Sequence, residues 1–123
     1  MTNPVETPHQ IVHFSVEETT KFDEFSRIYG DIKATAAEQG GRVQLLGEFV
    51  NFGDYAAFER AFANIRKGLA ELKEVERFAV LTDRKWMDMI VKSESFLLPH
   101  LKMKAFDAVN QGDAKNWLLG KPV

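Results

Sequence analysis

Apolar positions along the chain recur with two different periods, and the alternation of these periods predicts the fold. Residues 11–16 alternate apolar and polar side chains, as in a strand with one buried face. Residues 22–36 and 55–72 place apolar side chains three and four apart, which indicates two amphipathic helices. Between these helices, residues 43–52 are largely apolar on both faces, as expected of an interior strand.

The second half of the chain repeats this order. Residues 75–81 contain a short apolar run typical of a strand covered on both faces, and Thr82-Asp83 then supplies capping oxygens for a third helix that ends at Pro99. Residues 101–106 alternate apolar side chains with lysines, which is typical of a protected sheet edge, and a last helical segment follows Asp107. The pattern predicts one small α/β domain with a mostly parallel or mixed sheet of four to five strands and about four helices.

Composition adds bounds to this prediction. Residues 1–8 carry two prolines and few apolar groups, so we expect a flexible lead-in before a domain spanning residues 9–123. The chain has 45% hydrophobic and 28% charged residues, no cysteine, no signal-peptide pattern and no long apolar run, so we expect a cytoplasmic protein. A net charge of -2 without a basic stripe argues against nucleic-acid binding.

Three aspartates mark the expected carboxyl ends of strands, where ligands of parallel sheets usually bind. Asp54, Asp83 and Asp107 could form a carboxylate cluster that holds Mg²⁺ or transfers a proton. Each aspartate also directly precedes a predicted helix, where an N-cap contributes roughly 1 kcal/mol and explains the residue type without chemistry. We favour three helix caps.

The sequence offers no constellation with assignable catalytic roles. His9, His13 and His100 lack the spacing of a metal site, and no phosphate-binding or dinucleotide-binding loop or nucleophile elbow is present. Ser15 and the other serines have no base at a recognisable spacing, although folding can bring partners together. We therefore expect no metal, no cofactor and no enzymatic activity.

The third predicted helix has more apolar surface than one layer of core requires. Its apolar side chains cover an arc of about 220°, with Glu94 near the middle. Glu94 either reaches solvent or pairs with a lysine, or it is a polar group inside an apolar ligand pocket. The residues that we expect to line such a pocket are Trp86, Met87, Ile90, Glu94, Phe96 and Leu97, with Phe58 and Phe62 contributed by the preceding helix.

A family resemblance covers residues 43–118. It is carried by the passage from Arg66 through Leu81, then by Thr82-Asp83-Arg84-Lys85-Trp86, Leu97-Leu98-Pro99, Phe106-Asp107 and Ala114 to Trp117. These residues resemble the SpoIIAA-like family, which is related to the STAS domains of anti-sigma-factor antagonists and sulfate transporters. The resemblance implies a small α/β fold in non-enzymatic domains. Its similarity to CRAL-TRIO lipid-binding domains implies apolar ligands or membrane association.

Two departures from the family pattern bear on function. Anti-sigma antagonists carry a phosphorylatable serine at the start of the second helix, but this chain reads Asn-Phe-Gly-Asp-Tyr over residues 51–55. The N-terminal part, where the family's first strands would sit, matches poorly, which leaves open the alternative that the first strand is missing or displaced. We predict a non-catalytic module that binds a lipid-like or apolar small ligand, with peripheral membrane contact as an extension. The alternative is a regulatory protein-interaction module of the STAS type, without that serine, whose apolar surface is buried against a protein partner or a second copy.

Overall fold

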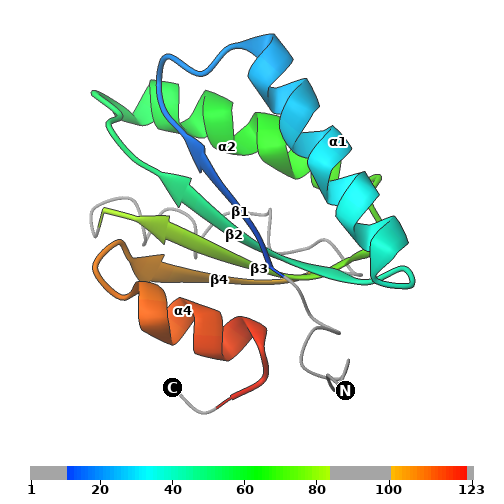
Figure 1. Cartoon of the computed structure of the whole chain (residues 1–123). Helices are drawn as coiled ribbons and strands as arrows, with labels where there is room; N and C mark the ends of the chain where they lie inside the picture. The colour runs from blue at the N-terminus through cyan, green and yellow to red at the C-terminus, as the bar shows by residue number, and fades with distance from the viewer. Residues whose placement is uncertain (1–10, 84–100, 122–123) are drawn as a thin grey trace.

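The computed structural model describes residues 11–83 and 101–121, and the expected third helix lies outside these ranges. The described elements follow in the order β1 (Ile11–Val16), α1 (Phe22–Glu38), β2 (Val43–Phe49), α2 (Tyr55–Leu69), β3 (Val75–Thr82), β4 (Lys102–Asp107) and α4 (Gln111–Leu118). Figure 1 shows them with the strands running side by side. The predicted alternation of strands and helices is confirmed over these residues.

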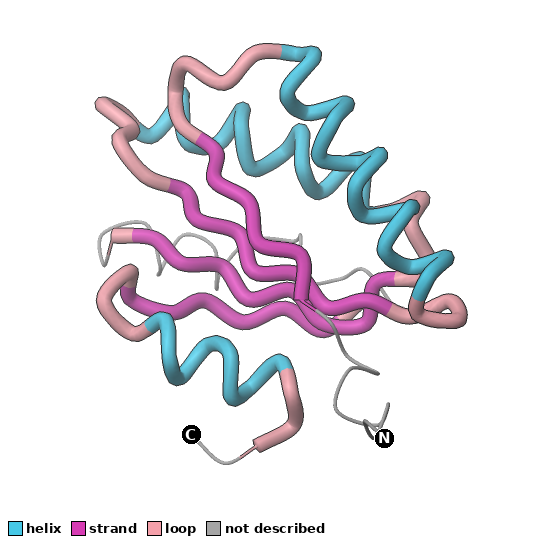
Figure 2. Tube along the Cα trace, viewed as in Figure 1, coloured by secondary structure: helices cyan, strands magenta, loops and turns pink. Residues whose placement is uncertain are grey.

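All four strands are parallel and lie in their order along the chain, β1-β2-β3-β4. Helices α1 and α2 cover one face of the sheet and α4 packs on the other (Figures 1 and 2). The alternation over residues 11–16 correctly predicted the first strand, and β1 pairs with β2 over its full length, so the alternative of a missing or displaced first strand is wrong. Strand β2 ends before Val50, earlier than predicted, because Asn51 takes a positive φ of 61° that a strand cannot continue through.

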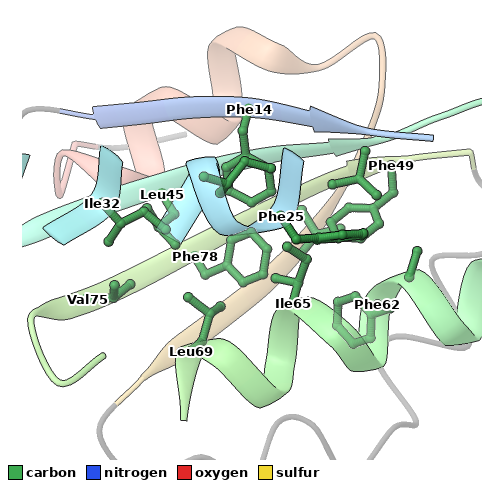
Figure 3. Packing of buried hydrophobic residues seen from close by; sticks show 14 of the residues in the cluster. Phe14, Phe25, Ile32, Leu45, Phe49, Phe62, Ile65, Leu69, Val75 and Phe78 are labelled. Carbon is green, nitrogen blue, oxygen red and sulfur yellow. The ribbon is translucent and has the colours of Figure 1, made fainter. Parts of the chain in front are cut away.

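The core lies between the sheet and the two helices α1 and α2, and aromatic rings fill much of it (Figure 3). Phe49 is at its centre, with ring centroids 5.5 Å from Phe62 and 6.5 Å from Phe78. The rings of Phe14 and Phe78 lie 5.9 Å apart and meet over Gly47. A side chain at Gly47 would collide with both rings, so glycine is required by packing at this position.

The opposite face of the sheet has a smaller cover. Helix α4 is only 8 residues long and packs Ala114 and Leu118 against Leu46, Leu81 and neighbouring apolar residues. The rest of this face carries polar side chains from β1, β2 and β4. The sheet is therefore buried deeply on one face and only partly on the other.

Two aromatic residues that the helical periodicity places with the core are exposed. Phe22 is 81% exposed and Tyr55 is 42% exposed. Each is the first residue of its helix, α1 or α2, so its side chain lies where the helix begins beyond the carboxyl ends of the strands. Helical periodicity predicts the direction around the helix axis in which a side chain points. Whether that side chain is buried depends also on its position along the axis.

The start of α1 also differs from the prediction. Thr20 resembled the first residue of a capping box with Asp23, but its hydroxyl accepts from the backbone N–H of Glu17, at 2.8 Å. The helix begins at Phe22, and Glu24 folds back to accept from the backbone N–H of Lys21, at 2.9 Å. The capping pattern is therefore shifted by one residue.

Candidate functional site

Most of the predicted ligand-lining residues lie outside the described part of the chain. Trp86, Met87, Ile90, Glu94, Phe96 and Leu97 all fall within residues 84–100. Phe58 and Phe62 are described and lie buried in the core, with ring centroids 6.0 Å and 5.5 Å from Phe49. Core packing accounts for both aromatic residues, and their role beside a ligand stays a prediction.

The three aspartates do not act alike. Asp54 caps α2 as predicted, since its carboxylate accepts from the backbone N–H of Ala57 at 2.8 Å. Asp107 was expected to cap the last helix, and this is wrong: it is the last residue of β4, and its carboxylate accepts from Val109, at 3.2 Å. Helix α4 begins only at Gln111, because a turn separates it from the strand. Asp83 is exposed at the end of the described segment.

A carboxylate metal centre finds no support at this edge of the sheet. Within residues 11–83 and 101–121, no three histidine or acidic side chains approach closely enough to share a metal ion. The three aspartates are in this part of the chain. Asp54 and Asp107 each bond a backbone N–H near their own position, which accounts for both residue types without metal chemistry.

The start of α2 is occupied by the protein's own carboxylates. Besides the cap from Asp54, the side chain of Glu18 accepts from the backbone N–H of Gly53, at 2.8 Å. Unbonded N–H groups at a helix start attract anions, and here two acidic side chains already satisfy some of them. No sequence pattern indicated the contact from Glu18, which comes from the loop after β1. The chain has no serine at this place, and two carboxylates of its own already accept from backbone N–H groups there.

Folding does bring one serine together with a histidine and an acid. On the face of the sheet that α4 partly covers, Ser15 donates to Glu48, at 2.8 Å, and His13 Nε2 lies 3.5 Å from the same carboxylate oxygen. The serine proton is therefore directed to the carboxylate. A nucleophilic serine must give its proton to a base that a third group orients, and this arrangement lacks that order. The group is a polar surface contact between β1 and β2.

A small hollow lies beneath the end of α4. Arg77 donates to the carbonyl of Trp117 and lies over its ring, with 5.5 Å from the guanidinium carbon to the ring centroid. Gln44 is only 1% exposed and donates to Glu76, while its Oε1 has no partner among the described residues. The hollow measures about 130 Å³. This size suits water better than an organic ligand, since small-molecule sites usually measure about 300 to 1,000 Å³.

Another hollow, bordered by described residues, runs between α1 and α2 on their outer side, away from the sheet. One part, of about 390 Å³, is lined by Phe22, Tyr29, Lys33, Asn64, Lys67, Gly68, Glu71 and Leu72. A second part, of about 210 Å³, is lined by Glu17, Glu18, Thr20, Phe25, Ala57, Arg60, Ala61 and Asn64. Because Asn64 borders both parts, we treat them as one surface and name it the α1–α2 groove.

A close approach of the two helices forms the floor of the α1–α2 groove. The ring of Tyr29 lies directly over Gly68, where any side chain would collide with it. Its hydroxyl donates to the backbone carbonyl of Asn64, at 2.7 Å. Burial raises the pKa of the Tyr29 hydroxyl above its usual value. The residue therefore stays neutral at physiological pH and fixes α1 against α2.

The border of the groove combines an exposed aromatic ring with charges. Phe22 lies at one end, and Lys33 and Lys67 stand on α1 and α2 with Glu71 nearby. The helical periodicity did not indicate this surface, because Phe22 and Tyr29 share the spacing of the core residues of α1. The available sign was Gly68, a glycine inside a strongly periodic helix, which often marks a close contact.

No helix in the described ranges is long and apolar enough to cross a membrane.

Of the comparisons with known proteins, the one with protein families agrees with the fold. No curated protein and no solved structure matches the chain. A family model described as SpoIIAA-like matches residues 11–119, so the match includes the N-terminal strand and helix that we had expected to fit poorly. With nearly the whole described fold inside this match, the chain belongs to the SpoIIAA-like family.

Proposed function

We propose that this protein is a non-catalytic regulatory module that holds a segment of another protein in the α1–α2 groove. The observation that carries the proposal is the groove itself, an apolar hollow of about 390 Å³ beside a phenylalanine that is 81% exposed. Large exposed aromatic side chains beside a hollow are typical anchors of protein interfaces. The STAS relationship of the family supports the same class of function.

The chemistry of the described residues supports the non-catalytic part. The contact among His13, Ser15 and Glu48, which brings a serine, a histidine and an acid together, is ordered wrongly for catalysis. Within the described ranges, no three histidine or acidic side chains lie close enough to hold a metal ion together. SpoIIAA-like domains are generally binding or regulatory modules, which agrees with this absence of assignable roles.

The shape of the groove favours a protein segment over a small molecule. Phe22, Lys33, Asn64, Lys67 and Glu71 border it and are all exposed. A typical small-molecule site encloses most of its ligand. An open groove between two helices instead suits a segment of a partner protein that inserts an apolar side chain into the groove. The other side of that segment would pack against the rest of the partner.

Site-specific crosslinking tests the proposal. A photoreactive phenylalanine analogue is placed at Phe22 and, as a matched control, at Val109, which is 85% exposed in the turn before α4. We expect the analogue at Phe22, irradiated in the source cells, to yield one discrete protein adduct that the analogue at Val109 does not yield. Adducts of equal yield at both positions, or none at Phe22, would contradict the proposal.

The crosslinked protein then allows a quantitative test. Calorimetric titration with the purified partner should show at least about tenfold weaker binding for Phe22→Ser, since a buried aromatic anchor contributes more than 1.4 kcal/mol. Val109→Ser should bind as the wild type does. Equal affinities for both variants would place the partner somewhere other than the groove.

A further inference from the structure

One edge of β1, which we call the free edge, presents backbone groups that pair with no other described strand. The carbonyl of Val16 accepts from Val50 on the β2 side, at 3.1 Å. Because backbone groups of successive strand residues point to opposite sides, Val16, Phe14 and Val12 face β2. The N–H and C=O groups of the alternate residues, Ile11, His13 and Ser15, therefore face outward. No strand in the described ranges lies beyond β1.

Such an edge is a template for another strand unless something blocks it. The other edge strand, β4, carries two exposed lysines, Lys102 and Lys104, which discourage pairing. On β1 the exposed side chains are His13 and Ser15, and both contact Glu48 on the neighbouring strand. Strand β1 thus lacks the lysines that protect β4.

Charges beside this edge specify what can pair with it. On α1, Tyr29 and Lys33 face α2, because they line the groove. At 100° per residue, the opposite flank of α1 carries Glu24, Asp31 and Glu38, with Arg27 as its single cation. This flank lies on the β1 side of the molecule (Figure 1).

The other face of the sheet adds one more acid beside the edge. Glu48 lies next to Ser15 and His13 there. Carboxylates therefore lie along the flank of α1 beside the free edge and, on the other face of the sheet, one strand inside it on β2, and a strand with basic side chains would complement them.

We propose that the free edge of β1 accepts an extended, basic segment of a partner protein, which adds to the sheet as a fifth strand. Backbone hydrogen bonds to Ile11, His13 and Ser15 would hold the segment, and its lysines or arginines would face Asp31 and Glu38. A second copy of this chain fits less well. Antiparallel pairing of two β1 strands would bring the two acidic flanks of α1 together and place His13 opposite its counterpart.

This surface is separate from the α1–α2 groove, because it lies on the other flank of α1. Failure of one surface to bind therefore leaves the other unaffected. Crosslinking at Phe22 reports on the groove, whereas the backbone amides of β1 report on the edge.

Hydrogen exchange measured by NMR tests the proposal at single amides. The probe is an eight-residue peptide of alternating lysine and valine with blocked termini, and its control replaces each lysine by glutamate. With the basic peptide in excess, we expect exchange at His13 and Ser15 to slow by at least about tenfold, while Phe14 and Val16, which already bond β2, stay unchanged. The acidic peptide should leave all four amides unchanged.

Three outcomes would overturn the proposal. The first is unchanged exchange at His13 and Ser15 at millimolar basic peptide. The second is equal slowing with the acidic peptide. The third is slowing in the protein alone that grows with protein concentration, which would assign the edge to a second copy.

Two sets of variants check the mechanism. Ser15→Pro removes one outward N–H group together with the hydroxyl, whereas Ser15→Ala removes the hydroxyl alone. Only the proline variant should therefore bind the basic peptide at least about tenfold more weakly. Asp31→Lys combined with Glu38→Lys changes exposed positions only, so this double variant should fold. It keeps the proposal testable if Ser15→Pro does not fold. This double variant should prefer the acidic peptide, and an unchanged preference for the basic one would refute the charge argument.

Discussion

The two edge strands of the sheet, β1 and β4, differ in how they are held and in how they are protected. Strand β1 buries Phe14 and Val16 in the large core beneath α1. Strand β4 buries Phe106 in the smaller cluster under α4, 6.0 Å from the ring of Trp117, and carries exposed lysines. The more firmly anchored strand is thus the one without protecting charges. Burial of one face and protection of an edge are therefore independent properties of a strand.

The largest expected effect tests how firmly β1 is anchored. Phe14→Ala should lower the free energy of unfolding by about 4 kcal/mol, because the ring fills space against Phe78 in a core that cannot close over it. Phe106→Ala should cost about 1 kcal/mol less, since the cluster under α4 has fewer members. Urea unfolding followed by circular dichroism measures both values. Equal losses, or a larger loss at Phe106, would break the comparison.

A glycine substitution tests the same anchor from the neighbouring strand. Gly47→Ala should cost about 3 kcal/mol, because the new methyl group collides with the rings of Phe14 and Phe78. The matched control is Gly30→Ala on α1, where no atom lies within 4 Å and alanine should stabilise the helix by about 0.5 to 1 kcal/mol. Opposite signs in urea unfolding are expected. A loss below about 1 kcal/mol at Gly47 would mean that Phe14 moves aside freely.

A smaller effect measures how α1 is fixed above β1. Tyr29→Phe should cost about 1 kcal/mol at pH 7 through loss of the hydrogen bond to the carbonyl of Asn64. Burial raises the pKa of Tyr29 in the folded protein, so its stabilising contribution is complete below pH of about 10 and is lost as the pH rises through the raised folded value. The stability difference between wild type and variant should therefore shrink above that pH. A constant difference in unfolding free energy at high pH would argue against burial of the hydroxyl.

The smallest change in stability is expected at β4. Replacing Lys102 and Lys104 together by threonine should change the unfolding free energy by less than about 0.5 kcal/mol, because both side chains are exposed. The double variant should nevertheless associate more readily than the wild type in sedimentation velocity, since the edge loses its charges. Unchanged association would show that the lysines do not protect this edge.

Over the described residues, local sequence patterns predicted the elements and their order with few errors. Alternation over residues 11–16, apolar runs in β2 and β3, and lysines along β4 each report which faces of a strand are buried. A strand with buried faces has few alternatives, because a slip by one residue would expose its apolar side chains. The parallel sheet and the cap at Asp54 follow from the same local rules.

The surfaces that we propose for binding were not predictable in this way. Phe22 and Tyr29 share the helical periodicity of the core. The position of α1 relative to α2 and the sheet leaves Phe22 exposed and places the ring of Tyr29 over Gly68. The pairing of Glu18 with Gly53 joins residues 35 apart in the sequence. Likewise, β1 is an edge only because the other three described strands lie on one side of it. Periodicity along the chain determined which residues are apolar together, and packing between distant segments decided which of them are covered.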